Sequence, residues 1–167
     1  GGGFIERSER GAEAERLLLH VVDGGAKLDP NAWEFADALM ELGQLYSRAA
    51  DYPMPRPAPE YYPQAIRRLT EAIERYPDDP RINNLRYRLA HAYRLSARSI
   101  RDELTTERPE VERIALTQTR MAHLDAASRN YAIAIDGYEA ILPHKRSPEV
   151  QQNLKFAIFW RADCAFD

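Results

Sequence analysis

Apolar residues recur at steps of three and four along most of this chain, and this spacing predicts amphipathic helices. The apolar positions of the stretch at 62–73 return 69 residues later without a gap, and those of 84–89 return at the same offset. A self-similarity that spans a helix, a turn and a second helix is typical of repeat arrays, in which each unit buries its apolar face on its neighbour. The sequence therefore predicts an all-α fold, built from antiparallel helical hairpins stacked as an α-solenoid.

The parts of this array can be placed along the chain. Asp23-Gly24-Gly25 ends a first helix, since glycine can adopt the left-handed conformation that closes a helix. Asp29-Pro30 supplies a cap and a first-turn proline for the next helix, which we expect to run to about Ala50 with Trp33 on its inward face. We predict one domain over residues 1–167. Its parts are a partial hairpin at 4–25, a repeat at 29–77 with a proline-rich insertion at 51–60, an extended repeat at 80–143, and the first helix of a further or capping repeat at 149–166.

The extended repeat has two long helices, at 81–104 and 111–142, joined by a short connection that makes them antiparallel. Apolar positions on the second helix alternate steps of three and four, which is the spacing of a coiled-coil seam. We expect a closed hairpin that protrudes beyond the repeat body. The predicted seam is Met121, Leu124, Ser128, Tyr131, Ile135, Tyr138 and Leu142, and the stripe facing it is Ile82, Leu85, Leu89, Tyr93, Ile100 and Leu104.

The insertion at 51–60 carries four prolines at alternate positions, Pro53, Pro55, Pro57 and Pro59. This pattern excludes a helix and a central strand, and it favours an extended, polyproline-like loop. Two interpretations stay open: an ordered insertion packed on its hairpin, or a target for a module that binds proline-rich ligands.

Composition narrows the class of function. The chain is 44% hydrophobic and 29% charged, with the charges mixed along it to a net of −3 and no block of like charge that would indicate a nucleic acid or a membrane surface as partner. No apolar run approaches the roughly 20 residues of a membrane-spanning helix. Cys164 is alone, so no intrachain disulfide is expected, and both the cytoplasm and the bacterial periplasm are allowed.

Candidate chemistry is sparse. The four histidines lie far apart in sequence, and no His-x-x-x-His or Cys-x-x-Cys spacing indicates a metal. Gly24-Gly25 lacks the strand and the lysine-hydroxyl pair of a phosphate-binding loop. We interpret Cys164 as a packing residue, and we expect no enzyme activity, no cofactor and no metal. The histidines are His20, His91, His123 and His144.

Two motifs resemble the tetratricopeptide repeat (TPR) family. Leu42-Gly43-x-x-Tyr46 and Leu89-Ala90-x-x-Tyr93 match the large, small and aromatic positions of its first helix. The stretch from Tyr76 to Tyr93 is similar to repeats of bacterial envelope proteins, of the outer-membrane-assembly lipoprotein and Tol-Pal accessory type. The match departs from the family in the insertion at 51–60 and in the long helices of the extended repeat. The second helix matches at Tyr62, Ala65, Leu69, Ala72 and Pro77.

The resemblance implies a non-catalytic scaffold or adaptor in which first helices line a concave groove for a peptide or a partner helix. Side-chain amides can grip a peptide backbone, aromatic rings can stack on a ligand, and Arg94 favours an acidic one. These residues are expected on one exposed face, although a polar surface and packing between repeats are the alternatives. A structural subunit, docking through the long hairpin and the aromatic last helix, is the competing function. The predicted partner-binding residues are Asn84, Tyr87, His91, Arg94, Asn153, Phe156 and Trp160.

Overall fold

The computed structural model describes residues 2–51 and 54–166, with side chains from residue 8 onward. Within those residues the chain has six α-helices, two short 3₁₀ turns and no strand, which confirms the prediction of an all-α protein. The elements are α1 (Gly2–Val22), α2 (Trp33–Ser47), η1 (Ala58–Glu60), α3 (Tyr62–Arg75), α4 (Ile82–Glu103), α5 (Glu110–Glu139), η2 (Pro143–Lys145) and α6 (Pro148–Asp163).

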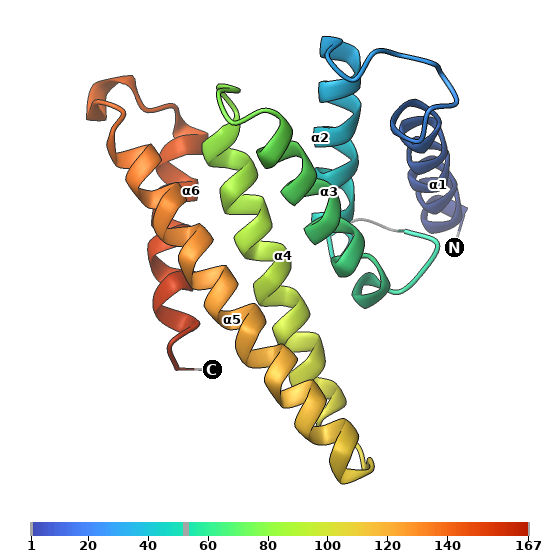
Figure 1. The fold of residues 1–167 in the computed structure, drawn as a ribbon, viewed down its shortest axis with the longest axis vertical. Helices are drawn as coiled ribbons and strands as arrows, with labels where there is room; N and C mark the ends of the chain where they lie inside the picture. The colour runs from blue at the N-terminus through green and yellow to red at the C-terminus, as the bar shows by residue number, and fades with distance from the viewer. Residues whose placement is uncertain (1, 52–53, 167) are drawn as a thin grey trace. The chain divides into compact units, whose positions relative to one another are not determined.

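The chain divides into two compact units, Gly1–Asp79 and Pro80–Asp167. The first unit contains α1, α2 and α3, and the second contains α4, α5 and α6, as the colours of Figure 1 make clear. The expectation of one domain over the whole chain stays a prediction.

In the first unit, α2 packs along α3 at a close distance. A Cβ atom on Gly43 would lie 2.9 Å from Cγ and Cδ2 of Leu69 and 3.3 Å from its backbone nitrogen, so only glycine fits without a shift of α3. Leu39, Leu42 and Leu69 are fully buried. The small, large and aromatic pattern of the sequence therefore describes how this pair of helices packs.

The start of α2 differs from the prediction. Asp29 accepts a hydrogen bond from the backbone nitrogen of Asn31 at 2.8 Å and forms a turn, so the helix begins at Trp33 and ends at Ser47. The side chain of an aspartate followed by proline can begin such a turn as readily as it can cap a helix. Trp33 is 70% exposed, so its predicted place on the inward face is wrong.

The proline-rich segment packs on the first unit from Met54 onward, and Pro53 lies outside the described residues. Met54 is buried, and the Arg56 side chain donates to the hydroxyl of Tyr61 and to Glu15 of α1. The residues at Ala58–Glu60 form a 3₁₀ turn, not the extended backbone expected over the whole segment. This portion is thus an ordered insertion, held by one apolar and one charged anchor.

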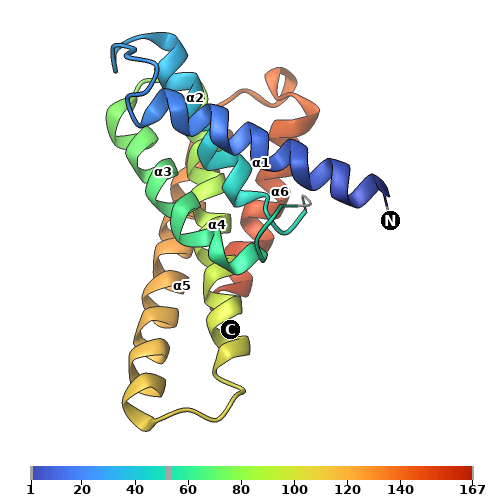
Figure 2. The same ribbon diagram turned by 90° about the vertical axis from the view of Figure 1, so that its right-hand side faces the viewer.

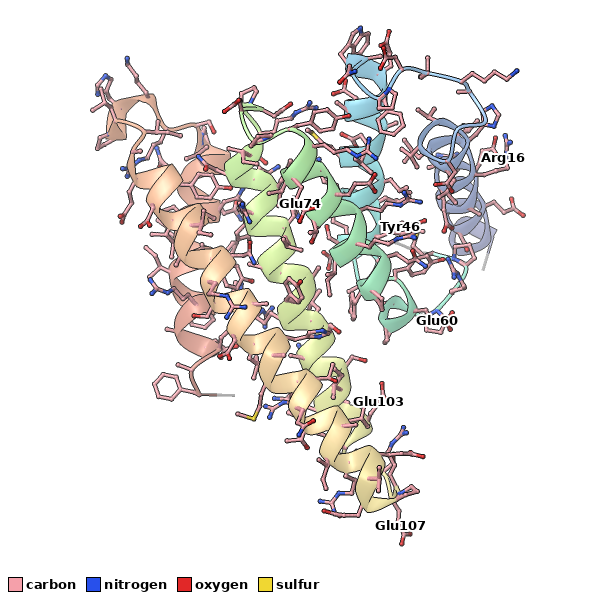
Figure 3. The ribbon with its side chains drawn as sticks, in the orientation of Figure 1. Arg16, Tyr46, Glu60, Glu74, Glu103 and Glu107 are labelled. Atoms are coloured by element: carbon pink, nitrogen blue, oxygen red, sulfur yellow. The ribbon has the colours of Figure 1, made fainter. Side chains whose placement is uncertain are left out.

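In the second unit, α4 and α5 form the predicted antiparallel hairpin, and α6 packs against α5 (Figures 1 and 2). At 1.5 Å per residue, α5 is about 45 Å long and α6 about 24 Å. Both views show the hairpin continuing past the end of α6. Glu103 and Glu107 mark the tip of the hairpin in Figure 3. The core of this unit is Tyr87, Ala90, Ala127, Tyr131, Ala134, Ile135, Tyr138 and Ala157.

The seam between the long helices is shorter than predicted. Leu124, Tyr131 and Tyr138 are buried, but Met121 is 61% exposed and Leu142 is 53% exposed and lies beyond the end of α5. On α4, Asn83, Arg86, Tyr87 and Ala90 also contact α5 or the core it forms, and none of them was in the predicted stripe. Of that stripe, Tyr93 contacts His123 of α5, with ring centroids 5.3 Å apart, and Leu85, Leu89 and Ile100 are buried. α4 carries two apolar lines, and spacing alone does not distinguish which of them faces α5.

Candidate binding site

A pocket of about 270 Å³ opens in the second unit, between α4 and the carboxyl end of α6. It has three arginines on one wall, with aromatic rings and a single carboxylate on the other. The lining residues are Arg94, Arg98 and Arg101 of α4, and Trp160, Asp163 and Phe166 of α6 and its end.

The arginines share one face of α4 because they stand at positions i, i+4 and i+7 of a helix. This face continues the line of Tyr87 and Ala90, which is buried in the core of the unit. α6 ends at Asp163, while the hairpin runs on. The later part of the same face therefore reaches solvent, and Arg98 and Arg101 are exposed there.

Arg94 differs from the other two arginines because it is buried, with 7% of its surface exposed. Its guanidinium carbon lies 3.7 Å from the centroid of the Trp160 ring, a cation–π contact. Its Nη1 lies 3.7 Å from Oδ2 of Asp163, which is an ion pair but too long for a hydrogen bond. Its Nε has no hydrogen-bond partner within the part of the chain that the structure describes. This nitrogen is itself buried, so a ligand in the pocket cannot reach it.

The charge of the pocket follows from its lining. Three arginines and one aspartate give a formal charge of +3 − 1 = +2. Arg101 also has an ion pair with Asp102 at 3.8 Å, with both side chains about half exposed or more. Such a pair contributes little in water, and a ligand can replace it. The pocket is therefore a local positive site on a chain whose net charge is −3.

The expectation that the predicted residues share one exposed face is wrong for Tyr87 and Arg94, which are buried. Tyr87 packs against Tyr131, with ring centroids 6.0 Å apart, and against His91 at 6.3 Å. His91 in turn lies 3.5 Å from the hydroxyl of Tyr131. These side chains are inside the unit because α5 and α6 cover this face of α4.

Asn84 and Asn153, predicted as two clamps, contact each other. The amide nitrogen of Asn153 donates to Oδ1 of Asn84 at 3.5 Å and to the hydroxyl of Tyr138 at 3.4 Å. Both asparagines are partly buried. The pair joins α4 to α6. The side-chain nitrogen of Asn153, which a peptide backbone would need as a donor, therefore already donates within the unit.

The structure thus brings Arg94 and Trp160 together at the pocket. Phe156, one turn before Trp160 on α6, is 42% exposed and is not among the residues that line the pocket. Arg98, Arg101 and Phe166 were not predicted as binding residues. The sequence did hold a signal for the arginines, since Arg94, Arg98 and Arg101 recur at helical spacing. Their relation to Trp160 depends on how α6 packs, and the spacing carries no information on that.

Burial shifts the pKa of several side chains in the second unit. It raises the pKa of the Tyr131 and Tyr87 hydroxyls further above the ordinary tyrosine range. Burial lowers the pKa of His123, which lies 3.1 Å from the hydroxyl of Ser96. The charged groups that line the pocket are the three arginines and Asp163.

No group of three or more His, Cys, Asp or Glu side chains in residues 8–51 and 54–166 is placed to hold a metal ion. Among the described helices, none combines the length and the apolar character needed to cross a bilayer.

Comparisons with protein-family models, with curated proteins and with solved structures find no match to this chain.

Proposed function

We propose that this chain is a non-catalytic protein–protein interaction module of TPR-like type, which binds a peptide of a partner protein at the pocket of its second unit. Three features support the repeat assignment: the recurrence at an offset of 69 residues, the antiparallel pairing of α4 with α5, and the close approach at Gly43. Small residues at such positions let helices approach closely in repeat proteins. The stacking of the two units as a solenoid is part of the proposal.

The observation that carries the binding function is the group of three arginines beside Trp160 and Phe166. Arginine and tryptophan are the residues that most often dominate binding energy at protein interfaces. Here two arginines and a phenyl ring are exposed in one concave place, and the third arginine is held in position by stacking on Trp160. An acidic peptide is the partner that this charge favours.

A displayed library of unmodified peptides tests this function. We expect the wild type to enrich acidic peptides, and the Arg98→Ala, Arg101→Ala double variant to lose them, because both exposed charges of the pocket are removed. The matched control is Arg113→Ala, Arg129→Ala, which removes two exposed charges of α5 that do not line the pocket. Enrichment that is equal for all three proteins, or absent for the wild type, would contradict the proposal.

A structural subunit is the second candidate, and exposed apolar side chains on α6 favour it. Ile158 and Phe159 are 50% and 59% exposed, and Phe156 is 42% exposed. Apolar residues grouped on one helix are typical of a surface that associates. Light scattering after size-exclusion chromatography tests it: assembly at high micromolar concentration, lost in Phe159→Lys, is the expected result. A strict monomer would exclude self-assembly.

A further inference from the structure

We propose that copies of this chain associate head to tail, with the outer face of α6 in one copy packed on the outer face of the protruding half of α5 in the next. This inference rests on self-assembly, the second function proposed above, and names the two surfaces that form the contact. The face of α6 is marked by Lys155, Phe156 and Phe159, and the face of α5 by Val111, Ile114, Met121, Ala122 and Asp125, all of them exposed.

The internal repeat shows that this face of α6 lacks the cover that its counterpart on α4 has. The counterpart faces α5: Arg86 donates to Oδ1 of Asn130 at 3.2 Å, and Tyr87 and Ala90 are buried in the core. On α6 the phenyl groups at the same positions are 42% and 59% exposed. The repeat therefore predicts that a helix antiparallel to α6 covers this face, as α5 covers α4. At the offset of 69 residues, the corresponding pairs are Arg86 and Lys155, Tyr87 and Phe156, and Ala90 and Phe159.

The protruding half of α5 supplies a helix of the kind required. Figures 1 and 2 show the hairpin continuing past the end of α6, so α6 does not cover the first part of α5. Val111, Ile114 and Met121 are 79%, 50% and 61% exposed there. Their steps of three and seven residues place them on one side of the helix. Apolar side chains grouped in this way are typical of a surface that associates.

Charge complementarity favours a second copy as the partner and sets the register. Lys155 and Asp125 are both exposed, and neither takes part in an ion pair within the described residues. The register that sets Phe159 against Ala122 brings them together. Lys155 is one turn back along α6 and Asp125 is about one turn forward along α5, so the ammonium and the carboxylate meet in an antiparallel pair.

Side-chain size supports the same register. Phe159 stands where α4 has Ala90, so a second helix can approach closely only through a small residue, which Ala122 provides. The Phe159 ring contacts the Trp160 ring edge to face, with centroids 4.7 Å apart, and Trp160 stacks on Arg94. The phenyl ring is thus held in place before a second copy binds, which lowers the entropy lost on association.

The two surfaces differ, so the contact between copies is heterologous and builds rings or open chains. A variant that is blocked at one surface keeps the other surface intact. Two variants blocked at different surfaces should therefore pair with each other. A contact between two α6 helices would not allow this, because both of its surfaces are lost in the same variant.

Sedimentation equilibrium of the full chain at high micromolar concentration tests this pairing. Phe159→Lys and Met121→Lys should each weaken self-association at least tenfold, and an equimolar mixture of the two should form a 1:1 dimer about as tightly as the wild type associates. The control Thr119→Lys adds the same charge at an exposed position on another side of α5 and should change association less than twofold.

Two results would overturn the inference. A mixture that stays monomeric, or normal assembly of Met121→Lys, would overturn the contact with α5 while assembly of the wild type leaves the proposed self-assembly intact. A wild type that is strictly monomeric would refute both.

Reversed charges test the register. Lys155→Glu and Asp125→Lys should each weaken association at least threefold, because each brings two like charges together. Both substitutions in one chain restore an ion pair of opposite sense and should return association to within twofold of the wild type. Circular dichroism verifies the fold of each variant. A double variant that associates no better than the single ones would show that the two side chains do not meet, which would overturn the proposed contact.

Discussion

The guanidinium carbon of Arg94 lies 3.7 Å from the centroid of the Trp160 ring. This contact joins α4 to α6, although most of the packing of α6 is on α5. It also fixes one wall of the pocket before any ligand enters. If the pocket binds a peptide as proposed, a central arginine that is already held by a ring loses less conformational entropy on binding than a mobile side chain would.

Arg94→Met should therefore lower the free energy of unfolding by about 1 to 2 kcal/mol, since the variant keeps most of the apolar stem but loses the cation–π contact. Urea denaturation followed by circular dichroism measures the change. Arg161→Met is the control, because Arg161 is an exposed arginine of α6, and we expect a change within about 0.5 kcal/mol. Equal effects at the two positions would mean that the contact with Trp160 contributes nothing to stability.

The seam of the long hairpin gives a second prediction. Leu124 is 8% exposed, so Leu124→Ala should leave a cavity and cost about 2 to 5 kcal/mol. Met121 was predicted in the same seam but is 61% exposed, and Met121→Ala should cost less than about 0.5 kcal/mol. The same urea experiment separates the two. A large cost at Met121 would show that this side chain is buried in the seam, as the sequence predicts.

Much of the fold could be predicted from the sequence, because apolar spacing is set by which side of each helix is buried. The helices, the long hairpin and the close approach at Gly43 follow from that spacing. The predicted start at Asp29 was wrong, because its side chain accepts a hydrogen bond from Asn31 in a turn before α2. Local hydrogen bonds of this kind compete with helix caps, and the residue type is the same in both.

The candidate site was less predictable. A repeat pattern assigned Tyr87 and Arg94 to an exposed face, but α5 and α6 cover that face in the second unit. The length of α6 relative to the hairpin decides where the cover ends, and so decides that Arg98 and Arg101 are exposed while Arg94 is not. Which face of a helix is covered depends on its contacts with segments distant in sequence. The periodicity within one helix gives no information on these contacts.

Gly43 tests the packing of the first unit. Gly43→Ala gains about 1 kcal/mol of helix propensity, but its Cβ would lie 2.9 Å from Leu69 side-chain atoms and 3.3 Å from the Leu69 backbone nitrogen. Because backbone cannot turn away, α2 and α3 must separate, and overpacking of this kind costs about 1 to 3 kcal/mol. We expect a net loss of stability, measured by thermal denaturation. Gln44→Ala, one position further on α2, is the control and should be neutral or slightly stabilising.

The last prediction concerns the pH dependence of stability. Burial raises the pKa of Tyr138 to about 12, although its hydrogen bond from Asn153 opposes the shift; an exposed tyrosine titrates near 10. Below pH 9 both the folded and the unfolded chain keep this proton, so the contribution is fully present. Between pH 10 and 12 the unfolded chain loses the proton first, and the free energy of unfolding falls by up to about 1.4 kcal/mol per pH unit for this group. Urea denaturation at pH 9 and 11.5 should therefore show a loss for the wild type that is about 2 kcal/mol smaller in Tyr138→Phe. An identical loss in both proteins would mean that Tyr138 ionises as readily in the folded chain as in the unfolded one.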